Sequence, residues 1–288
     1  MTGYMEITDN LIFKTCRREI RLGARTLIMG ILNVTPDSFS DGGRFAAPDM
    51  AVEEGVRMVE EGADILDVGG ESTRPGSDPV STDEELRRVL PVIGALAKRV
   101  DAPLSIDTTK AAVAREAVNC GAEIINDVSA MRFDADMPQV TVTTGAGLIL
   151  MHMRGMPKDM QRGRLLYRSL LDDISDFLRE RLQSAQSAGI EPERMMIDPG
   201  IGFGKTTEDN MRLLKHLSRF LTLGRPVLTG VSRKSFIGKA TGSEPAERIG
   251  GTAAAVAVAI MNGSSVVRVH DVKIMKKVAL MTDAIVRA

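Results

Sequence analysis

The 288-residue chain has no tryptophan, only two cysteines and three histidines, and aromatic residues make up 3% of it. Cys16 and Cys120 are too few and too far apart for a disulfide framework or a thiolate metal site, so we expect reduced thiols. The chain also lacks the His-Glu-x-x-His pattern, and no metal cage made of protein groups alone is expected. Aliphatic residues and the 17 methionines must therefore fill the core.

Net charge and long apolar runs are also missing. A formal net charge of −1 provides no broad basic face, so nucleic acid is not expected as a partner. The longest apolar stretch, residues 252–261, falls short of the roughly 20 residues that cross a bilayer, and the N-terminus has no signal-peptide pattern. We expect a cytoplasmic enzyme that acts on small molecules, without a membrane partner.

Eight short apolar runs recur along the chain, and each ends abruptly in polar residues. They occupy residues 27–32, 65–68, 104–106, 124–125, 148–151, 195–197, 227–229 and 266–269. Such runs suit strands that are buried on both faces. The segments that follow them carry apolar residues at helical spacing: 49–61, 82–99, 110–119, 134–144, 170–187, 208–221, 245–261 and 272–286. Eight β/α units predict a (β/α)8 TIM barrel, with a doubly wound sheet as the alternative.

No Pro/Gly/Ser-rich linker or charge block divides the chain, so residues 1–288 are predicted to form one domain. The first 25 residues precede the repeat. Within them, Leu11-Ile12-Phe13 and Ile20-Arg21-Leu22 flank a polar turn and predict a β-hairpin. We expect this hairpin to close the bottom of the barrel, where the strands begin.

The polar residues at the strand ends predict one active site, because TIM barrels carry their sites at the C-terminal ends of their strands. The candidates are Asn33, Asp107, Asn126, Asp198, Lys234, Arg268 and His270. Any one of them alone could be a helix cap or a turn residue. Together they offer carboxylate acceptors suited to a guanidine-like heterocycle edge, and cations suited to a phosphate or diphosphate.

A Gly-Lys-Thr sequence at residues 204–206 suggests a nucleotide-binding P-loop as a rival interpretation. That motif needs a glycine five positions before Gly204, where this chain has Pro199. Backbone amides at the wrong spacing would not wrap a phosphate in the same way. We expect instead that the glycines let backbone lie against a flat ring, with Phe203 nearby.

These motifs resemble those of the dihydropteroate synthases, the sulfonamide-target enzymes of folate biosynthesis. The resemblance runs through all eight strands: residues 29–43 (MGILNVTPDSFSDGG), 70–76 (GESTRPG), 105–108 (SIDT), 125–127 (IND), 151–155 (MHMRG), 198–206 (DPGIGFGKT), 230–235 (GVSRKS) and 268–271 (RVHD).

The resemblance implies a transferase that joins p-aminobenzoate to 7,8-dihydropterin-6-ylmethyl diphosphate and releases diphosphate. It implies a pterin site of Asp107, Asn126, Met151, Asp198, Phe203 and Lys234. It implies a p-aminobenzoate site of Thr73, Arg74, Pro75, Phe203, Lys234 and Ser235. It implies a diphosphate site of Asn33, Arg268 and His270, with Asn33 also facing Mg²⁺. The residues expected to act in catalysis are Asp107, Lys234, Arg268 and His270.

The family also implies a homodimer and a dissociative substitution, in which electrostatic stabilisation of the departing diphosphate dominates. The loops at residues 35–43 and 69–79 are expected to shield the site from water. Two alternatives remain. A pterin-binding methyltransferase domain shares the barrel and the pterin residues but needs no diphosphate site, and a pterin-binding protein without activity needs no catalytic groups.

Overall fold

Eight parallel strands form the centre of the computed structural model, which describes residues 11–35, 43–72, 77–155 and 167–288. They are β3 (Leu27–Asn33), β4 (Ile65–Gly69), β5 (Leu104–Asp107), β6 (Ile124–Asp127), β7 (Gly147–Met151), β8 (Met195–Asp198), β9 (Leu228–Gly230) and β10 (Val266–Val269). Each of the eight predicted strands is present. Their spatial order is β8-β7-β6-β5-β4-β3-β10-β9. A parallel bridge between Ile197 and Val227 joins β8 to the start of β9 and closes the sheet, so the predicted (β/α)8 barrel is confirmed.

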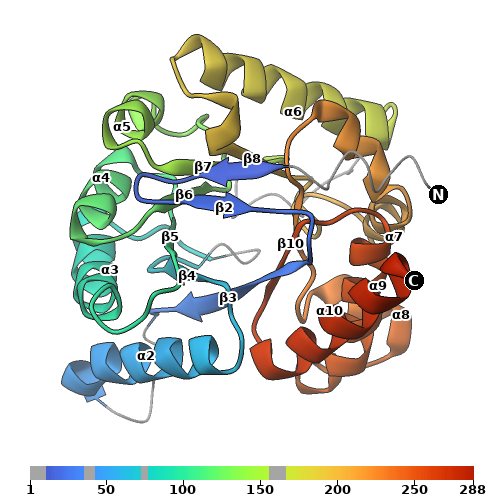
Figure 1. Cartoon of the computed structure of the whole chain (residues 1–288), viewed down its shortest axis with the longest axis horizontal. Helices are drawn as coiled ribbons and strands as arrows, with labels where there is room; N and C mark the ends of the chain where they lie inside the picture. Colours follow the sequence, from blue (N-terminus) through green and yellow to red (C-terminus); the bar gives the residue numbers. More distant parts are fainter. Residues whose placement is uncertain (1–10, 36–42, 73–76, 156–166) are drawn as a thin grey trace.

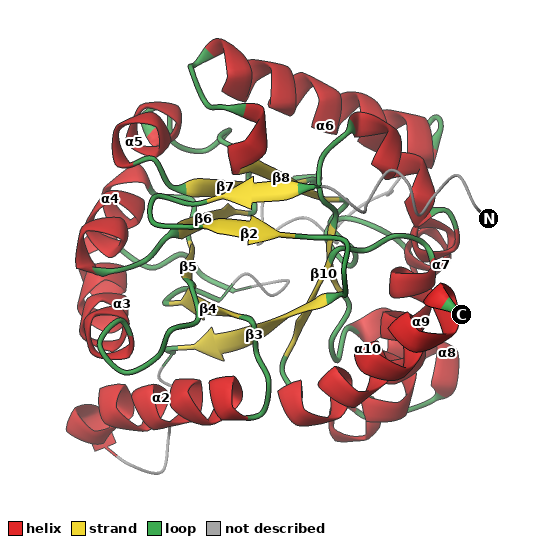
Figure 2. Ribbon diagram, in the orientation of Figure 1, coloured by secondary structure: helices red, strands yellow, loops and turns green. Residues whose placement is uncertain are grey.

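Helices surround the strands on the outside, as Figure 2 shows in red around yellow. They are α2 (Gly43–Glu60), α3 (Thr82–Leu96), α4 (Ala111–Cys120), α5 (Met137–Thr144), α6 (Leu170–Ser187), α7 (Thr207–Lys215), α8 (Ser235–Thr241), α9 (Ile249–Met261) and α10 (Val272–Arg287). Among the described residues, no helix is both long enough and apolar enough to cross a membrane.

Two predicted helices are divided in the structure. Helix α7 stops at Lys215, and a 3-10 helix over Leu217–Leu223 continues the segment. A 3-10 turn at Pro245–Glu247 precedes α9, and the short helix α8 before it was not predicted. Gly242 ends α8 with a φ of +73°. Apolar spacing runs through these breaks without a change of period, and a seven-residue helix is too short to show a period of its own.

The N-terminal hairpin lies across the end of the barrel where the strands begin (Figure 1, blue). Strands β1 (Ile12–Lys14) and β2 (Glu19–Arg21) pair antiparallel, with Phe13 opposite Ile20. The Phe13 side chain is fully buried against the first interior layer, which contains Leu22, Leu27, Met29, Ile65, Ile124, Ile149, Met196, Leu228 and Val266. The predicted hairpin is therefore confirmed, and it fills the bottom of the barrel.

A buried carboxylate fastens the hairpin turn to the barrel. Glu123, which directly precedes β6, is 2% exposed. Its Oε2 accepts hydrogen bonds from Thr15 Oγ1 at 2.7 Å and from Arg18 Nε at 3.1 Å. The buried carboxylate of Glu123 is thus hydrogen-bonded to the hairpin turn. Such bonds are the condition for burying a charge without a large cost in free energy.

We expect Phe13→Ala to lower the free energy of unfolding by about 3–5 kcal/mol, because it empties the bottom layer of the core. Chemical denaturation followed by circular dichroism measures the change. Met50→Ala on α2 is the control, because Met50 is 41% exposed and its loss should cost less than about 0.5 kcal/mol. A Phe13→Ala chain as stable as the control would contradict the role given to the hairpin.

Candidate active site

The predicted site residues lie at the end of the barrel opposite the hairpin. Asn33, Asp107, Met151 and Asp198 are the last residues of β3, β5, β7 and β8, and Asn126 is the last but one of β6. Because all eight strands are parallel and form a closed barrel, these ends surround one opening, which we call the mouth. Asp107, Asn126, Met151 and Asp198 are all at least nine-tenths buried there.

Two glycines at strand ends lie directly against the mouth residues. A β-carbon added at Gly69 would lie 3.6 Å from Cβ of Asp107 and 3.8 Å from Oδ1 of Asn33. A β-carbon at Gly230 would lie 3.7 Å from Nζ of Lys234 and 3.8 Å from Cβ of Arg268. All four distances are ordinary van der Waals contacts, so the ends of β4 and β9 border the mouth directly.

Arg268 on β10 connects two carboxylates inside the mouth. Its Nη2 donates to Oδ2 of Asp107 at 2.7 Å, and its Nε donates to Oδ2 of Asp67 at 2.5 Å. Burial raises the pKa of Asp107 to about 7; Arg268 opposes this rise, whereas Asp67, Glu85 and Asp127 add to it. The Asp107 carboxylate is thus poorly solvated, and Arg268 offsets the influence of its acidic neighbours only in part.

Asp198 and Lys234 are two further groups of opposite charge in the mouth, and each influences the pKa of the other. Burial raises the pKa of Asp198, and the nearby Lys234 opposes that rise. Burial likewise lowers the pKa of Lys234 to about 8, against the attraction of Asp198. The ammonium group of Lys234 donates to the carbonyl of Ile201 and lies 4.6 Å from the ring centre of Phe203. Lys234 therefore contacts an aromatic face and lies within the electrostatic influence of a carboxylate, which suits a flat, polar ring.

The loop between β8 and α7 lies close against the backbone that follows β7. Gly200, Gly202 and Gly204 have φ values of +71°, +86° and +66°. A β-carbon at Gly200 would lie 1.9 Å from the carbonyl oxygen of His152, so only glycine fits there. Thr206 caps α7 through a reciprocal capping box with Asp209.

Lys205 points into the core of this loop. Its Nζ lies 2.9 Å from Nδ1 of His152 and donates to the carbonyls of Gly200 and Phe203 at 2.8 and 3.1 Å. Burial lowers the pKa of His152 well below its ordinary value, and the charge of Lys205 lowers it further. A P-loop lysine must reach a phosphate. Lys205 instead holds the loop together, in agreement with the rejection of that motif.

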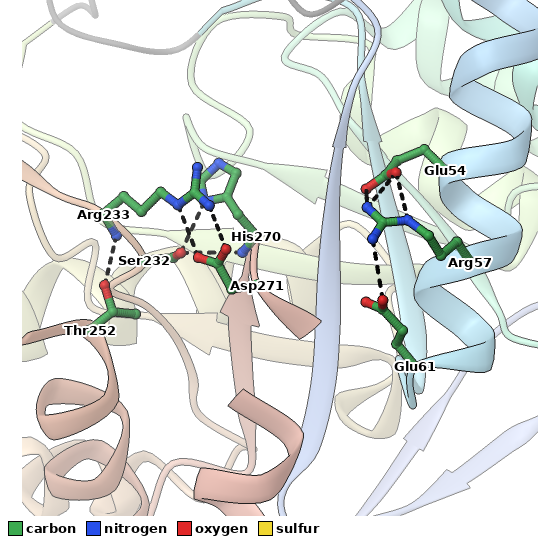
Figure 3. A network of polar contacts seen from close by, with 8 residues as sticks. All are labelled: Glu54, Arg57, Glu61, Ser232, Arg233, Thr252, His270 and Asp271. Atoms are coloured by element: carbon green, nitrogen blue, oxygen red, sulfur yellow. Dashed lines mark hydrogen bonds and ion pairs between the residues drawn. The ribbon is translucent and has the colours of Figure 1, made fainter. Parts of the chain in front are cut away.

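The residues predicted for the diphosphate lie around the ends of β3 and β10. Nδ1 of His270 lies 3.0 Å from Oγ of Ser232. Figure 3 draws this contact as a dashed line. Beside them, Arg233 pairs with Asp271 and its backbone amide donates to Thr252 Oγ1 at 3.1 Å. Arg233 has a φ of +56°, which an L-residue adopts at a cost, and these contacts fix it.

Figure 3 also contains a second network, on the outer surface. Arg57 of α2 pairs with Glu54 of the same helix and with Glu61, which directly follows the helix. These pairs join residues three and four apart in the sequence. They belong to the helix surface and not to the mouth.

The predicted p-aminobenzoate site is described in part. Thr73, Arg74 and Pro75 lie outside the described residues, as do residues 36–42 of the first predicted shielding loop. Ser235 is exposed at the start of α8, beside Lys234. Residues 69–72 and 77–79 of the second predicted loop are described. Glu71 of this loop pairs with Lys110, which also pairs with the buried Glu85.

Asp67 and Ser232 contact predicted site residues but were not themselves predicted. Asp67 is fully buried and accepts a hydrogen bond from Nδ2 of Asn126 at 3.0 Å as well as the one from Arg268. A charged residue inside the apolar run at 65–68 was the signal for it. Ser232 gave no comparable signal, because serine is ordinary in a loop.

Comparisons with known proteins agree with this geometry. A family model described as "Pterin binding enzyme" matches residues 29–270. The chain is 46% identical to dihydropteroate synthase of Synechocystis over 92% of both sequences.

Solved structures give the same result. Dihydropteroate synthase of Xanthomonas albilineans with 4-aminobenzoic acid superposes with a TM-score of 0.90, at 44% identity and 96% and 98% coverage of this chain and that one. The same enzyme in complex with 7,8-dihydropteroate gives a TM-score of 0.85, at 42% identity and 95% and 98% coverage. The barrel mouth carries the predicted acceptors and cations, and these relatives match nearly the whole length of the chain. The chain therefore belongs to the dihydropteroate synthase family.

Proposed function

We propose that this chain condenses 7,8-dihydropterin-6-ylmethyl diphosphate with p-aminobenzoate to form 7,8-dihydropteroate and diphosphate, one step in folate biosynthesis. The observation that carries the proposal is the hydrogen bond between Arg268 and Asp107. It brings a cation predicted for the diphosphate into contact with a carboxylate predicted for the pterin. A single substrate that carries both groups can therefore occupy both at once.

The pterin would lie among Asp107, Asn126 and Asp198. Asp107 Oδ1 is buried without a hydrogen-bond partner among the described residues, and it is available to accept from a ring N–H. Met151 packs with Phe203 in a small apolar cluster at the same end of the barrel. Lys234 and Phe203 would border both the pterin and the p-aminobenzoate. In the family pattern, the p-aminobenzoate site is completed by Thr73, Arg74, Pro75 and Ser235.

The diphosphate would be held by Arg268, His270 and Asn33. Within the described residues no group of three His, Cys, Asp or Glu side chains could hold a metal on its own. The Asn33 amide, partly exposed at the mouth and without a hydrogen-bond partner in the described part of the chain, fits Mg²⁺, which takes few protein ligands and keeps phosphate oxygens and waters. When bound there, Mg²⁺ would neutralise charge on the departing diphosphate.

The reaction would then proceed by dissociative substitution. The bond between the pterin methylene carbon and the diphosphate oxygen breaks first, and the methylene becomes electron-deficient. Arg268 and His270 stabilise the negative charge on the departing group. Asp107, close to the ring and incompletely neutralised, favours the cationic pterin. The p-aminobenzoate nitrogen forms the new bond and loses a proton, so no protein nucleophile is needed.

The two alternatives predict a different mouth. A methyltransferase domain needs the pterin residues alone, whereas here His270, Asn33 and Arg268 also carry the groups that a diphosphate requires. A protein that only binds pterin would likewise have no need of the groups placed for a diphosphate. These observations favour the synthase over both.

We also propose that two copies of the chain associate through α9 and α10. Ile274, Met281 and Ile285 lie on one face of α10 at helical spacing and are 44%, 61% and 58% exposed. Met261 of α9 is 61% exposed, and α9 packs directly against α10. Apolar groups gathered in this way mark an interaction surface.

We further propose that the protein is located in the cytoplasm. Neither Cys16 nor Cys120 forms a disulfide, which suits that location.

Product formation tests the function. Purified chain is incubated with Mg²⁺, the pterin diphosphate and p-aminobenzoate, and dihydropteroate and diphosphate are measured. We expect both products in equal amounts. Bound pterin without product would instead favour the binding-only alternative.

Two variants, compared by their binding affinities, distinguish the two ends of the substrate. Asp198→Ala should weaken binding of 6-hydroxymethyl-7,8-dihydropterin, which lacks diphosphate, about tenfold or more. His270→Ala should leave that affinity unchanged and weaken only the diphosphate-bearing substrate. Isothermal titration calorimetry measures both, and the reverse pattern would contradict the assignment.

The dependence of kcat/KM on pH should be bell-shaped. Below about pH 7 protonation of Asp107 removes the carboxylate, and above about pH 8 deprotonation of Lys234 removes the ammonium; each limb should approach a tenfold loss per pH unit. Lys234→Arg is the matched control, because arginine stays protonated and should abolish only the alkaline limb. An alkaline limb that persists unchanged in this variant would assign it to another group.

The oligomer is tested by Met281→Lys/Ile285→Lys, which places two charges on the exposed face of α10. We expect a dimeric mass for the wild-type chain and a monomeric mass for the variant in sedimentation equilibrium at micromolar concentration. Lys239→Ala on α8 is a surface control that should stay dimeric. A monomeric wild-type chain would refute the proposal.

A further inference from the structure

Asp67 is a charged residue inside the barrel, where aliphatic residues are the rule. Side chains alternate along β4: Leu66 and Val68 pack in the outer core beneath the helices, and Ile65 packs in the interior layer at the bottom. Asp67 has the same orientation as Ile65 and lies one layer higher, opposite Ile31 of β3 and Ser105 of β5. Its side chain is fully buried.

A carboxylate in this position is a cost to folding. Taking a charge from water costs several kcal/mol, and well-packed apolar residues often serve a fold as well as a buried ion pair. The environment compensates only one of the two oxygens. Asp67 Oδ1 and its neighbour Ser105 Oγ are buried without a hydrogen-bond partner among the residues described. Packing alone does not account for the charge.

The other oxygen holds two residues of the predicted site at once. Oδ2 of Asp67 accepts from Arg268 Nε at 2.5 Å and from Asn126 Nδ2 at 3.0 Å. Asp67 therefore connects β10 to β6 through β4. It lies below the level at which a ligand would enter, so it reaches the ligand only through these two partners.

The bond to Asn126 selects one of two amide orientations. A side-chain amide can rotate by half a turn and exchange its donor for its acceptor with little change of shape. A carboxylate accepts only, so it keeps Nδ2 towards itself. Oδ1 and the remaining N–H of Asn126 are then left for another partner, in a fixed order. A heterocycle with adjacent acceptor and donor atoms would therefore bind in only one orientation.

The bond to Arg268 fixes the plane of the guanidinium. Nε is held by Asp67 and Nη2 by Asp107, two contacts on different atoms of one planar group. A planar group held at two points loses its freedom to rotate. Arg268 is therefore oriented before a substrate arrives.

We propose that Asp67 is a positioning residue of the pterin site, which orders the amide of Asn126 and the guanidinium of Arg268 without touching the substrate. The inference rests on the proposed synthase function. It adds to that function a residue that sets which heterocycle edge the mouth accepts.

Asp67→Asn tests the inference, since it keeps the shape and removes the charge that forces the order of the amide. We expect it to weaken binding of 6-hydroxymethyl-7,8-dihydropterin about tenfold. The KM for p-aminobenzoate should change by less than about twofold, and kcat should fall because Arg268 is less well held. Asp64→Asn is the matched control. Asp64 immediately precedes the same strand, at its other end, and pairs with Arg25.

A double-mutant cycle separates positioning from a general loss of structure. In an Asn126→Ala background the effect of Asp67→Asn on pterin affinity should shrink to about twofold, because the amide that Asp67 orders for the pterin is gone. An equal effect in both backgrounds would overturn the proposal, and so would a loss of affinity no larger than that of Asp64→Asn. Because affinity is measured without turnover, a wild-type chain that binds pterin but makes no product refutes the synthase function separately.

Discussion

The mouth of the barrel depends on the balance between its buried carboxylates and Arg268. Three strands bring Asp67, Asp107 and Asp198 into a space that excludes most water, and charges of one sign cannot be confined in this way without a cation. Arg268 satisfies two of the three, and Lys234 faces the third. The electrostatic state of every other group in the mouth follows from this arrangement.

That balance is incomplete, and the incompleteness is what a reaction can use. Asp107 keeps an oxygen without a partner, and its raised pKa reflects a carboxylate that lacks solvation. A substrate that supplies N–H groups and a developing positive charge improves the environment of this anion. Preorganised groups of this kind need no rearrangement when charge develops, which is the main source of electrostatic catalysis.

The sequence predicted the strands, the barrel and the convergence of Asp107, Asn126 and Asp198, because strand-end polarity is a local pattern with a fixed spatial meaning in a parallel barrel. It could not predict that Arg268 would contact Asp67, since the two residues are 201 positions apart and the contact exists only once the barrel closes. The same holds for His270 and Ser232. Apolar spacing likewise could not locate the break after Lys215, because a 3-10 segment preserves nearly the same period.

The hairpin at the bottom and the charges at the mouth lie at opposite ends of the same strands. Phe13 and its layer contribute to stability at one end, while Asp67 and Asp107 bear unsatisfied polar atoms at the other. Substitutions that stabilise the fold would therefore be expected first at the charged residues of the mouth, because uncharged residues there remove the free-energy cost of burying a charge. Folding does not maintain this end of the barrel; natural selection for the reaction does.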